Sequence, residues 1–152
     1  MKKILTFGLL FFAFSVYAFS QNEFQKLKNE EISQTDLRLA TSLAEKLLAG
    51  QKSGKIYLLS EDEAIPQVAK GLTESMQISS YESIRALFGD YKSLNFAEGW
   101  QLNADQRYTI YRFRGDFSES QDRPEIRIVF NEAGKLSGFW IRPWEDTISG
   151  TP

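Results

Sequence analysis

The segment FGDYKSLNFAEGW, residues 88–100, contains the point at which the hydrophobic pattern of this chain changes its period. Before Gly89, apolar residues recur at intervals of three and four, which is typical of amphipathic helices. After Tyr91, they alternate with polar or small residues, which is typical of strands that bury one face. The change of period predicts an α+β domain in which helices come first and a sheet follows.

Three helices are predicted before the change of period. The first begins near Ser33 or Thr35 and ends at Gly50, because glycine commonly stands just after a helix. Its apolar residues share one face at helical spacing, and they are Leu37, Ala40, Leu43, Ala44, Leu47 and Leu48. The preceding residues 21–34 are polar, and we interpret them as a lead-in segment or an early helical turn.

Two capping-box patterns predict the starts of the other helices. Ser60 with Glu63 precedes an apolar stripe, within which Pro66 predicts a kink or a late start. Ser79 with Glu82 precedes a second stripe, which ends at the glycine of the segment quoted above. Residues 35–145 are therefore expected to form one domain whose helices pack on a sheet, followed by a tail at residues 146–152.

After the change of period, alternation predicts four strands. Their apolar and aromatic positions fall within residues 91–102, 108–117, 126–130 and 136–144. Turn-forming residues separate them at 103–105 and 131–134, and a polar loop follows the second strand. Four consecutive strands with short links predict a curved antiparallel meander with the helices on one face.

The first 20 residues have the features of a signal peptide. Lys2 and Lys3 precede an uncharged run that extends to Ala18, and Ala18-Phe19-Ser20 places small residues around a cleavage site before Gln21. The apolar run of about 15 residues is shorter than the roughly 20 that span a bilayer. The sequence therefore predicts export to the periplasm or the extracellular space, with no membrane attachment after cleavage.

The composition excludes several kinds of chemistry. The chain contains no histidine and no cysteine, so it has no thiolate nucleophile, imidazole base, disulfide, or nitrogen and sulfur ligands for zinc. Without Lys2 and Lys3, 16 basic residues face 20 acidic ones, a balance that opposes nucleic-acid binding. We expect no cofactor, and we expect aromatic packing to stabilise the core.

Two segments carry a resemblance to a known superfamily. Residues 88–93, FGDYKS, join the last helix to the sheet, and residues 130–141, FNEAGKLSGFWI, form a hairpin. With the order of helices and strands, they resemble small exported bacterial domains of the nuclear transport factor 2-like (NTF2-like, cystatin-like) superfamily. The resemblance covers residues 37–144 and implies a cone-shaped α+β fold and an accessory role. It implies no catalytic residues, because the shared motifs are structural.

The predicted sheet has apolar groups on both faces, but helices can cover only one. A second apolar face is typical of a pocket or an interface. We therefore predict a ligand-binding surface on the concave face, and its candidate residues are Trp100, Tyr111, Phe113, Trp140 and Arg142. The alternative is a strongly curved sheet that folds both faces into the core.

The arginines of the strands allow two interpretations. Arg112, Arg127 and Arg142 would converge beside an anionic ligand and bind it through bidentate contacts. Alternatively, strand arginines would form cross-strand pairs with the acidic residues Glu98, Asp116 and Glu125. Charge pairs are common on sheets, so this second interpretation is favoured.

No metal site or catalytic group is predicted. Residues 116–122 start like a calcium loop, but Gln121 and Arg127 stand where glycine and glutamate are needed. There is no Gly-x-Ser-x-Gly motif, and no tyrosine–carboxylate pair is singled out by spacing. We expect a non-catalytic exported binding or accessory domain for a small apolar or amphiphilic ligand or a protein partner. The alternatives are a homodimeric interaction module without a ligand and a tyrosine–carboxylate enzyme.

Overall fold

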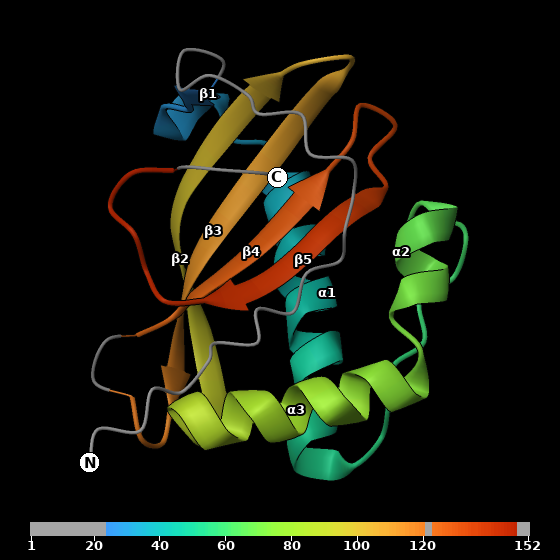
Figure 1. Cartoon of the computed structure of the whole chain (residues 1–152). Helices are drawn as coiled ribbons and strands as arrows, with labels where there is room; N and C mark the ends of the chain where they lie inside the picture. Colours follow the sequence, from blue (N-terminus) through green and yellow to red (C-terminus); the bar gives the residue numbers. More distant parts are fainter. Residues whose placement is uncertain (1–23, 121–122, 149–152) are drawn as a thin grey trace, which may run out of the picture.

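The computed structural model of the chain describes residues 24–120 and 123–148 (Figure 1). Its elements are β1 (Phe24–Lys26), the 3-10 helix η2 (Asn29–Glu31), α1 (Gln34–Ser53), α2 (Pro66–Gly71), α3 (Glu74–Phe88), β2 (Tyr91–Asn103), β3 (Arg107–Phe117), β4 (Glu125–Phe130) and β5 (Leu136–Arg142). The strands form one antiparallel sheet in the order β1-β2-β3-β4-β5. The predicted α+β class is confirmed. The predicted signal peptide lies outside the described residues.

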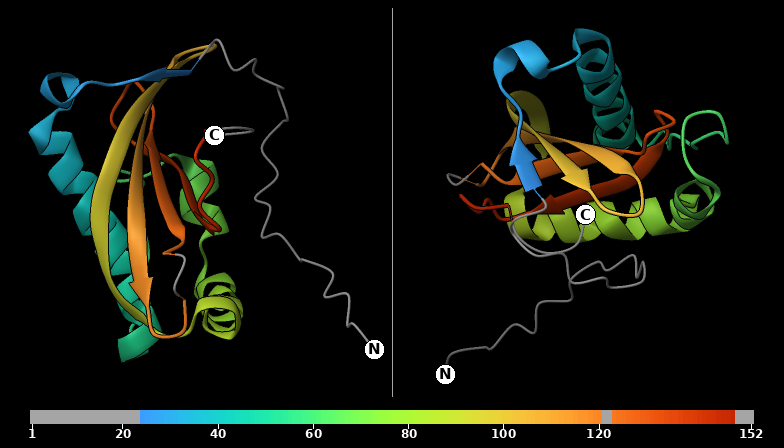
Figure 2. Two further views of the ribbon diagram at one scale, coloured as in Figure 1. Left: turned by 90° about the vertical axis from the view of Figure 1, so that its left-hand side faces the viewer. Right: turned by 90° about the horizontal axis from the view of Figure 1, so that it is seen from above.

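The helix α1 covers one face of the sheet, and α3 crosses the lower end of the molecule (Figures 1 and 2). In the left view of Figure 2, the strands bow toward α1, so the face away from α1 is concave. The main core lies between α1 and the sheet. Of the helices in the described ranges, none has the length and apolarity needed to cross a membrane.

The first helix begins as predicted and ends later than predicted. Ser33 caps it by accepting a hydrogen bond from the Asp36 amide at 3.3 Å. The prediction that it ends at Gly50 is wrong, because Gly54, with φ 69°, forms the C-cap. Gly50 is buried inside the helix, where a Cβ would lie 2.8 Å from the Tyr81 hydroxyl. Its small size therefore allows α1 and α3 to cross.

The late start predicted for α2 is confirmed, whereas α3 begins earlier than its capping box predicts. Glu63 does accept hydrogen bonds from the Ser60 amide and hydroxyl, both at 3.1 Å, but this pattern closes a turn. The helix starts late, with Pro66 in its first turn, because proline lacks the amide that a helix interior needs. Helix α3 begins at Glu74, more than a turn before Ser79, because Thr73 supplies the cap. It ends before Gly89 as predicted.

The sheet has five strands, so the prediction of four is corrected. The extra strand, β1, lies within residues 21–34, which we interpreted as a lead-in segment. It pairs with β2 through Phe24 opposite Leu102 and Lys26 opposite Trp100. Three residues are too few for an alternating pattern to be visible, and only the free edge of β2 makes them a strand.

Each face of the sheet buries its own apolar residues. Toward α1, the alternating residues of β3 and β4 are Tyr111, Phe113, Phe117, Ile126, Ile128 and Phe130. On the concave face, a smaller cluster contains Leu102, Ile110, Val129 and Ile148. Strand β5 ends at Arg142, and the predicted extension to Trp144 is wrong because Pro143 follows directly. Residues 143–148 instead loop outward past the edge of β2 (Figure 1), and Ile148 then joins the smaller cluster of the concave face.

Candidate functional site

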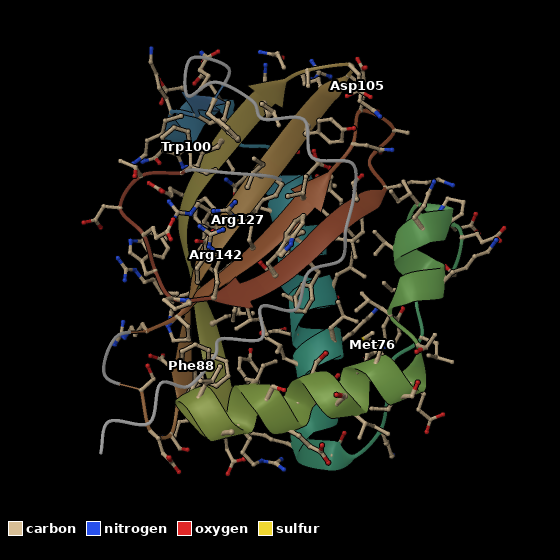
Figure 3. The ribbon with its side chains drawn as sticks, in the orientation of Figure 1. Met76, Phe88, Trp100, Asp105, Arg127 and Arg142 are labelled. Carbon is tan, nitrogen blue, oxygen red and sulfur yellow. The ribbon has the colours of Figure 1, made fainter. Side chains whose placement is uncertain are left out.

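Strand register places a row of charged residues across the middle of the concave face. Arg112 on β3 lies opposite Glu98 on β2 and Arg127 on β4. In the neighbouring row, Glu125 on β4 lies opposite Arg142 on β5. Because residues of one row point to one side of the sheet, these five side chains meet, and we call them the arginine cluster. Figure 3 shows Arg127 and Arg142 beside each other over this face.

Glu125 is the centre of the arginine cluster. Its fully buried carboxylate accepts hydrogen bonds from Arg112 Nε at 2.9 Å and Arg112 Nη2 at 3.0 Å, a bidentate pair. Arg127 Nε donates to the same carboxylate at 2.5 Å, and Arg142 Nε lies 3.7 Å from it. Burial raises the pKa of Glu125, but Arg112 and Arg127 more than offset this and hold the pKa below its ordinary value.

Glu98 joins the cluster to the edge of the sheet. It pairs with Arg112 and with Lys26 of β1, whose Nζ lies 2.5 Å from its carboxylate. Burial acts to raise the pKa of Glu98, whereas Lys26 and Arg112 lower it, and the net pKa is below the ordinary value. The short strand β1 therefore forms the edge of the sheet and also contributes the positive charge of Lys26 to the site.

Arg127 is the least satisfied member of the cluster. Its side chain is 1% exposed, yet its Nη2 has no hydrogen-bond partner among the described residues. Burial lowers the pKa of Arg127, which the charge of Glu125 opposes. A buried guanidinium donor without an acceptor is energetically costly. The arrangement therefore has a free donor where an acceptor oxygen would be stabilised.

Two indoles border the cluster. Trp140 lies opposite Arg127 in the same row, and Trp100 lies in the next row, opposite Ile110. The Trp140 ring folds over Gly138, where any Cβ would overlap it. Both indoles are partly exposed, so this face combines a charged centre with aromatic borders.

The structure divides the five predicted binding residues between the two faces. Trp100, Trp140 and Arg142 lie on the concave face. Tyr111 and Phe113 are buried under α1 in the main core, so we remove them from the candidate site. Alternation puts neighbours such as Phe113 and Arg112 on opposite faces of the sheet. The sequence did not show which of the two sets of alternating residues lies under α1.

The two interpretations of the arginines both describe part of the structure. Arg112, Arg127 and Arg142 do converge, and the centre on which they converge is Glu125. Cross-strand pairing with Glu98 and Glu125 is confirmed. The third predicted acidic residue, Asp116, instead pairs with Arg123, 3.0 Å away.

The C-terminal segment supplies residues that the sequence did not indicate. Glu145 lies 2.6 Å from Arg142 Nη2, and its carbonyl oxygen accepts a hydrogen bond from Arg112 Nη2 at 2.6 Å. The Trp144 ring lies over the guanidiniums of Arg112 and Arg114, at 4.0 and 3.6 Å. Alternation had assigned Trp144 to the predicted last strand, residues 136–144, and no pattern had singled out Glu145.

A tyrosine–carboxylate pair is present outside this face. The Tyr57 hydroxyl donates to Glu63, and Lys46 Nζ lies 3.4 Å from the phenol oxygen. The hydrogen bond to Glu63 is the main cause that raises the pKa of Tyr57. For Glu63, burial acts upward, but Tyr57, Ser60 and Lys46 bring the pKa below its ordinary value. Such shifts oppose proton exchange near neutral pH. The pair joins two parts of the segment between α1 and α2, and Lys46 of α1 contacts both residues.

The residues in the described ranges include no group of three or more acidic side chains placed to hold a metal ion. Comparisons of the chain with protein-family models, with curated proteins and with solved structures find no match.

Proposed function

We propose that this chain is an exported, non-catalytic binding domain whose concave sheet face holds an amphiphilic ligand with a carboxylate group. The observation that carries the proposal is the buried Arg127 guanidinium with its unpaired Nη2. The acidic group of the ligand would accept from Arg127 and Arg142, and its apolar part would lie against the Trp100 and Trp140 indoles.

Charge and geometry support a carboxylate as the recognised group. Arg112, Arg127, Arg142 and Lys26 face three carboxylates, those of Glu98, Glu125 and Glu145, so one positive charge is left over around this face. A guanidinium presents parallel donors that match a carboxylate. Partial burial strengthens such a pair, because the effective dielectric constant is lower than in water.

The cone-shaped NTF2-like architecture and export belong to the same proposal. The bowed sheet with α1 on one side supports the architecture, and the pattern of residues 1–20 supports export. Native mass spectrometry of the protein processed by its own host would measure signal cleavage, oligomeric state and any retained ligand. A ligand-free dimer would favour the homodimeric module over a ligand carrier.

A fluorescence titration tests the recognised group. All three tryptophans of the chain contact or border this face, so binding changes their emission. We expect octanoate to bind and 1-octanol, its uncharged analogue, to bind at least about tenfold more weakly, since a charged hydrogen bond contributes 1.5–3 kcal/mol.

Arg142→Gln should weaken octanoate binding by a similar factor of about ten. The matched control is Arg107→Gln, which removes an exposed arginine whose Nη2 lies 4.0 Å from Glu132. The control should bind octanoate like the wild type. Equal binding of octanoate and 1-octanol, or an unchanged affinity in Arg142→Gln, would contradict carboxylate recognition.

A further inference from the structure

The segment of residues 143–148 lies across the same face as the arginine cluster. It leaves the end of β5, contacts the arginine cluster through Trp144 and Glu145, and reaches the small apolar cluster of the concave face through Ile148. Pro143 and Glu145 are exposed, whereas Ile148 is 4% exposed. The segment therefore has an exposed beginning over the charged residues and a buried end among apolar ones.

Side chains provide the contacts that hold this segment to the sheet. Trp144 stacks on Arg112 and Arg114, Glu145 pairs with Arg142, and Ile148 packs beside Ile110 and Val129. Within the described ranges, no backbone-to-backbone hydrogen bond joins residues 143–148 to the strands. Opening the segment would thus break separate side-chain contacts and leave the hydrogen-bond ladder of β5 intact.

The Glu145 carboxylate offsets part of the positive charge of the arginine cluster. Three arginines and Lys26 face Glu98 and Glu125, and Glu145 adds a third carboxylate from the segment by pairing with Arg142. Its side chain is 52% exposed, and the Arg142 side chain is 28% exposed. A solvent-exposed pair of this kind is weak, so another carboxylate can compete for Arg142.

From these contacts we infer that residues 143–148 form a displaceable strap whose Glu145 carboxylate is an internal competitor for the ligand carboxylate. The inference rests on the proposed function, since it assigns a regulation to the same site. When a ligand carboxylate binds Arg142, the Glu145 carboxylate is released, the Glu145 carbonyl gives up its hydrogen bond from Arg112 Nη2, and Trp144 lifts from the guanidiniums. Ile148 stays buried and keeps the strap attached to the sheet.

Hydrogen exchange tests, without any ligand, whether the Glu145–Arg142 pair holds the strap on the sheet. In Glu145→Gln, amides of residues 144–148 should exchange about two- to fivefold faster than in the wild type, as expected for loss of an exposed pair. Glu132→Gln is the matched control, because it makes the same charge change at an exposed residue between β4 and β5. Unchanged exchange in Glu145→Gln would overturn the strap.

Titration with octanoate tests the competition. Glu145→Gln should bind octanoate about two- to fivefold more tightly than the wild type and Glu132→Gln. Octanoate should also accelerate exchange of residues 144–148 in the wild type. If octanoate binds all three proteins equally and leaves exchange unchanged, the strap is wrong and the proposed function stands. If exchange increases in Glu145→Gln but octanoate binds none of them, the proposed function is wrong, and the competitor role of Glu145 falls with it.

Discussion

At the scale of single residues, Glu125 is the buried carboxylate on which the charges of the concave face converge. Its carboxylate is fully buried and contacts Arg112, Arg127 and Arg142. A buried ion pair adds little net stability compared with an apolar replacement, but removal of one partner leaves buried charge uncompensated. The stability of this face therefore depends on keeping the whole cluster.

We predict that Glu125→Gln lowers the free energy of unfolding by about 3 kcal/mol, because two buried guanidiniums lose their counter-charge. Urea denaturation followed by tryptophan fluorescence measures this loss. Glu132→Gln, an exposed substitution with the same change of charge, should alter the free energy of unfolding by less than about 0.5 kcal/mol. Equal losses in the two variants would show that burial of Glu125 has no energetic consequence.

The depressed pKa values of Glu125 and Glu98 predict a pH dependence. Both carboxyls bind protons more weakly in the folded state, so their stabilisation is fully present above the ordinary value of 4.5. It is lost as the pH falls below 4.5 through the lowered folded-state pKa values. Denaturation curves between pH 7 and pH 3 should show falling stability, with a shallower fall in Glu125→Gln. An identical slope in that variant would contradict the assignment.

At the scale of elements, the joint between α3 and β2 depends on Gly89. This residue ends the helix with φ 83° and ψ −159°, a conformation that side chains rarely adopt. A Cβ at this position would also overlap the Ser118 hydroxyl, which accepts a hydrogen bond from the Asp90 amide at 2.8 Å. Helix end and strand start are therefore held together by one small residue.

Gly89→Ala should destabilise the protein by about 2 kcal/mol or more, because it combines backbone strain with a steric clash. Gly134→Ala is the matched control: Gly134 has φ 74°, but a Cβ there meets nothing within 4 Å. The control should lose only the strain, about 1 kcal/mol. Thermal denaturation of both variants measures the difference, and equal losses would remove the steric part of the explanation.

The elements also show where sequence patterns were sufficient. The period of the apolar residues located α1 and four of the strands, because each of these elements buries one face over several turns or alternations. It failed for β1, which has three residues and exists through pairing with β2. The late start of α2 at Pro66 was expected. The capping box at Ser79 misplaced the start of α3, because Thr73 caps this helix more than a turn earlier.

At the scale of the whole molecule, the sheet separates two kinds of interior. Toward α1 it buries an aromatic and aliphatic core, and on the concave face it buries charges beside a smaller apolar cluster. Candidate residues chosen from sequence were split between these interiors, because strand alternation defines two faces without identifying which one a helix covers. The sequence allowed Arg112, Arg127 and Arg142 to converge, and the strand register shows that they do.

The sequence by itself determined the α+β class, the order of the three α-helices and of the strands β2 to β5, and the absence of histidine and cysteine chemistry. These properties follow from local periodicity and composition, which need no knowledge of distant contacts. Only the tertiary structure decided which face holds the charges, that Glu125 lies at their centre, and that residues 143–148 cover them. Those properties depend on strand register and on contacts between residues far apart in the chain, and no local pattern records either.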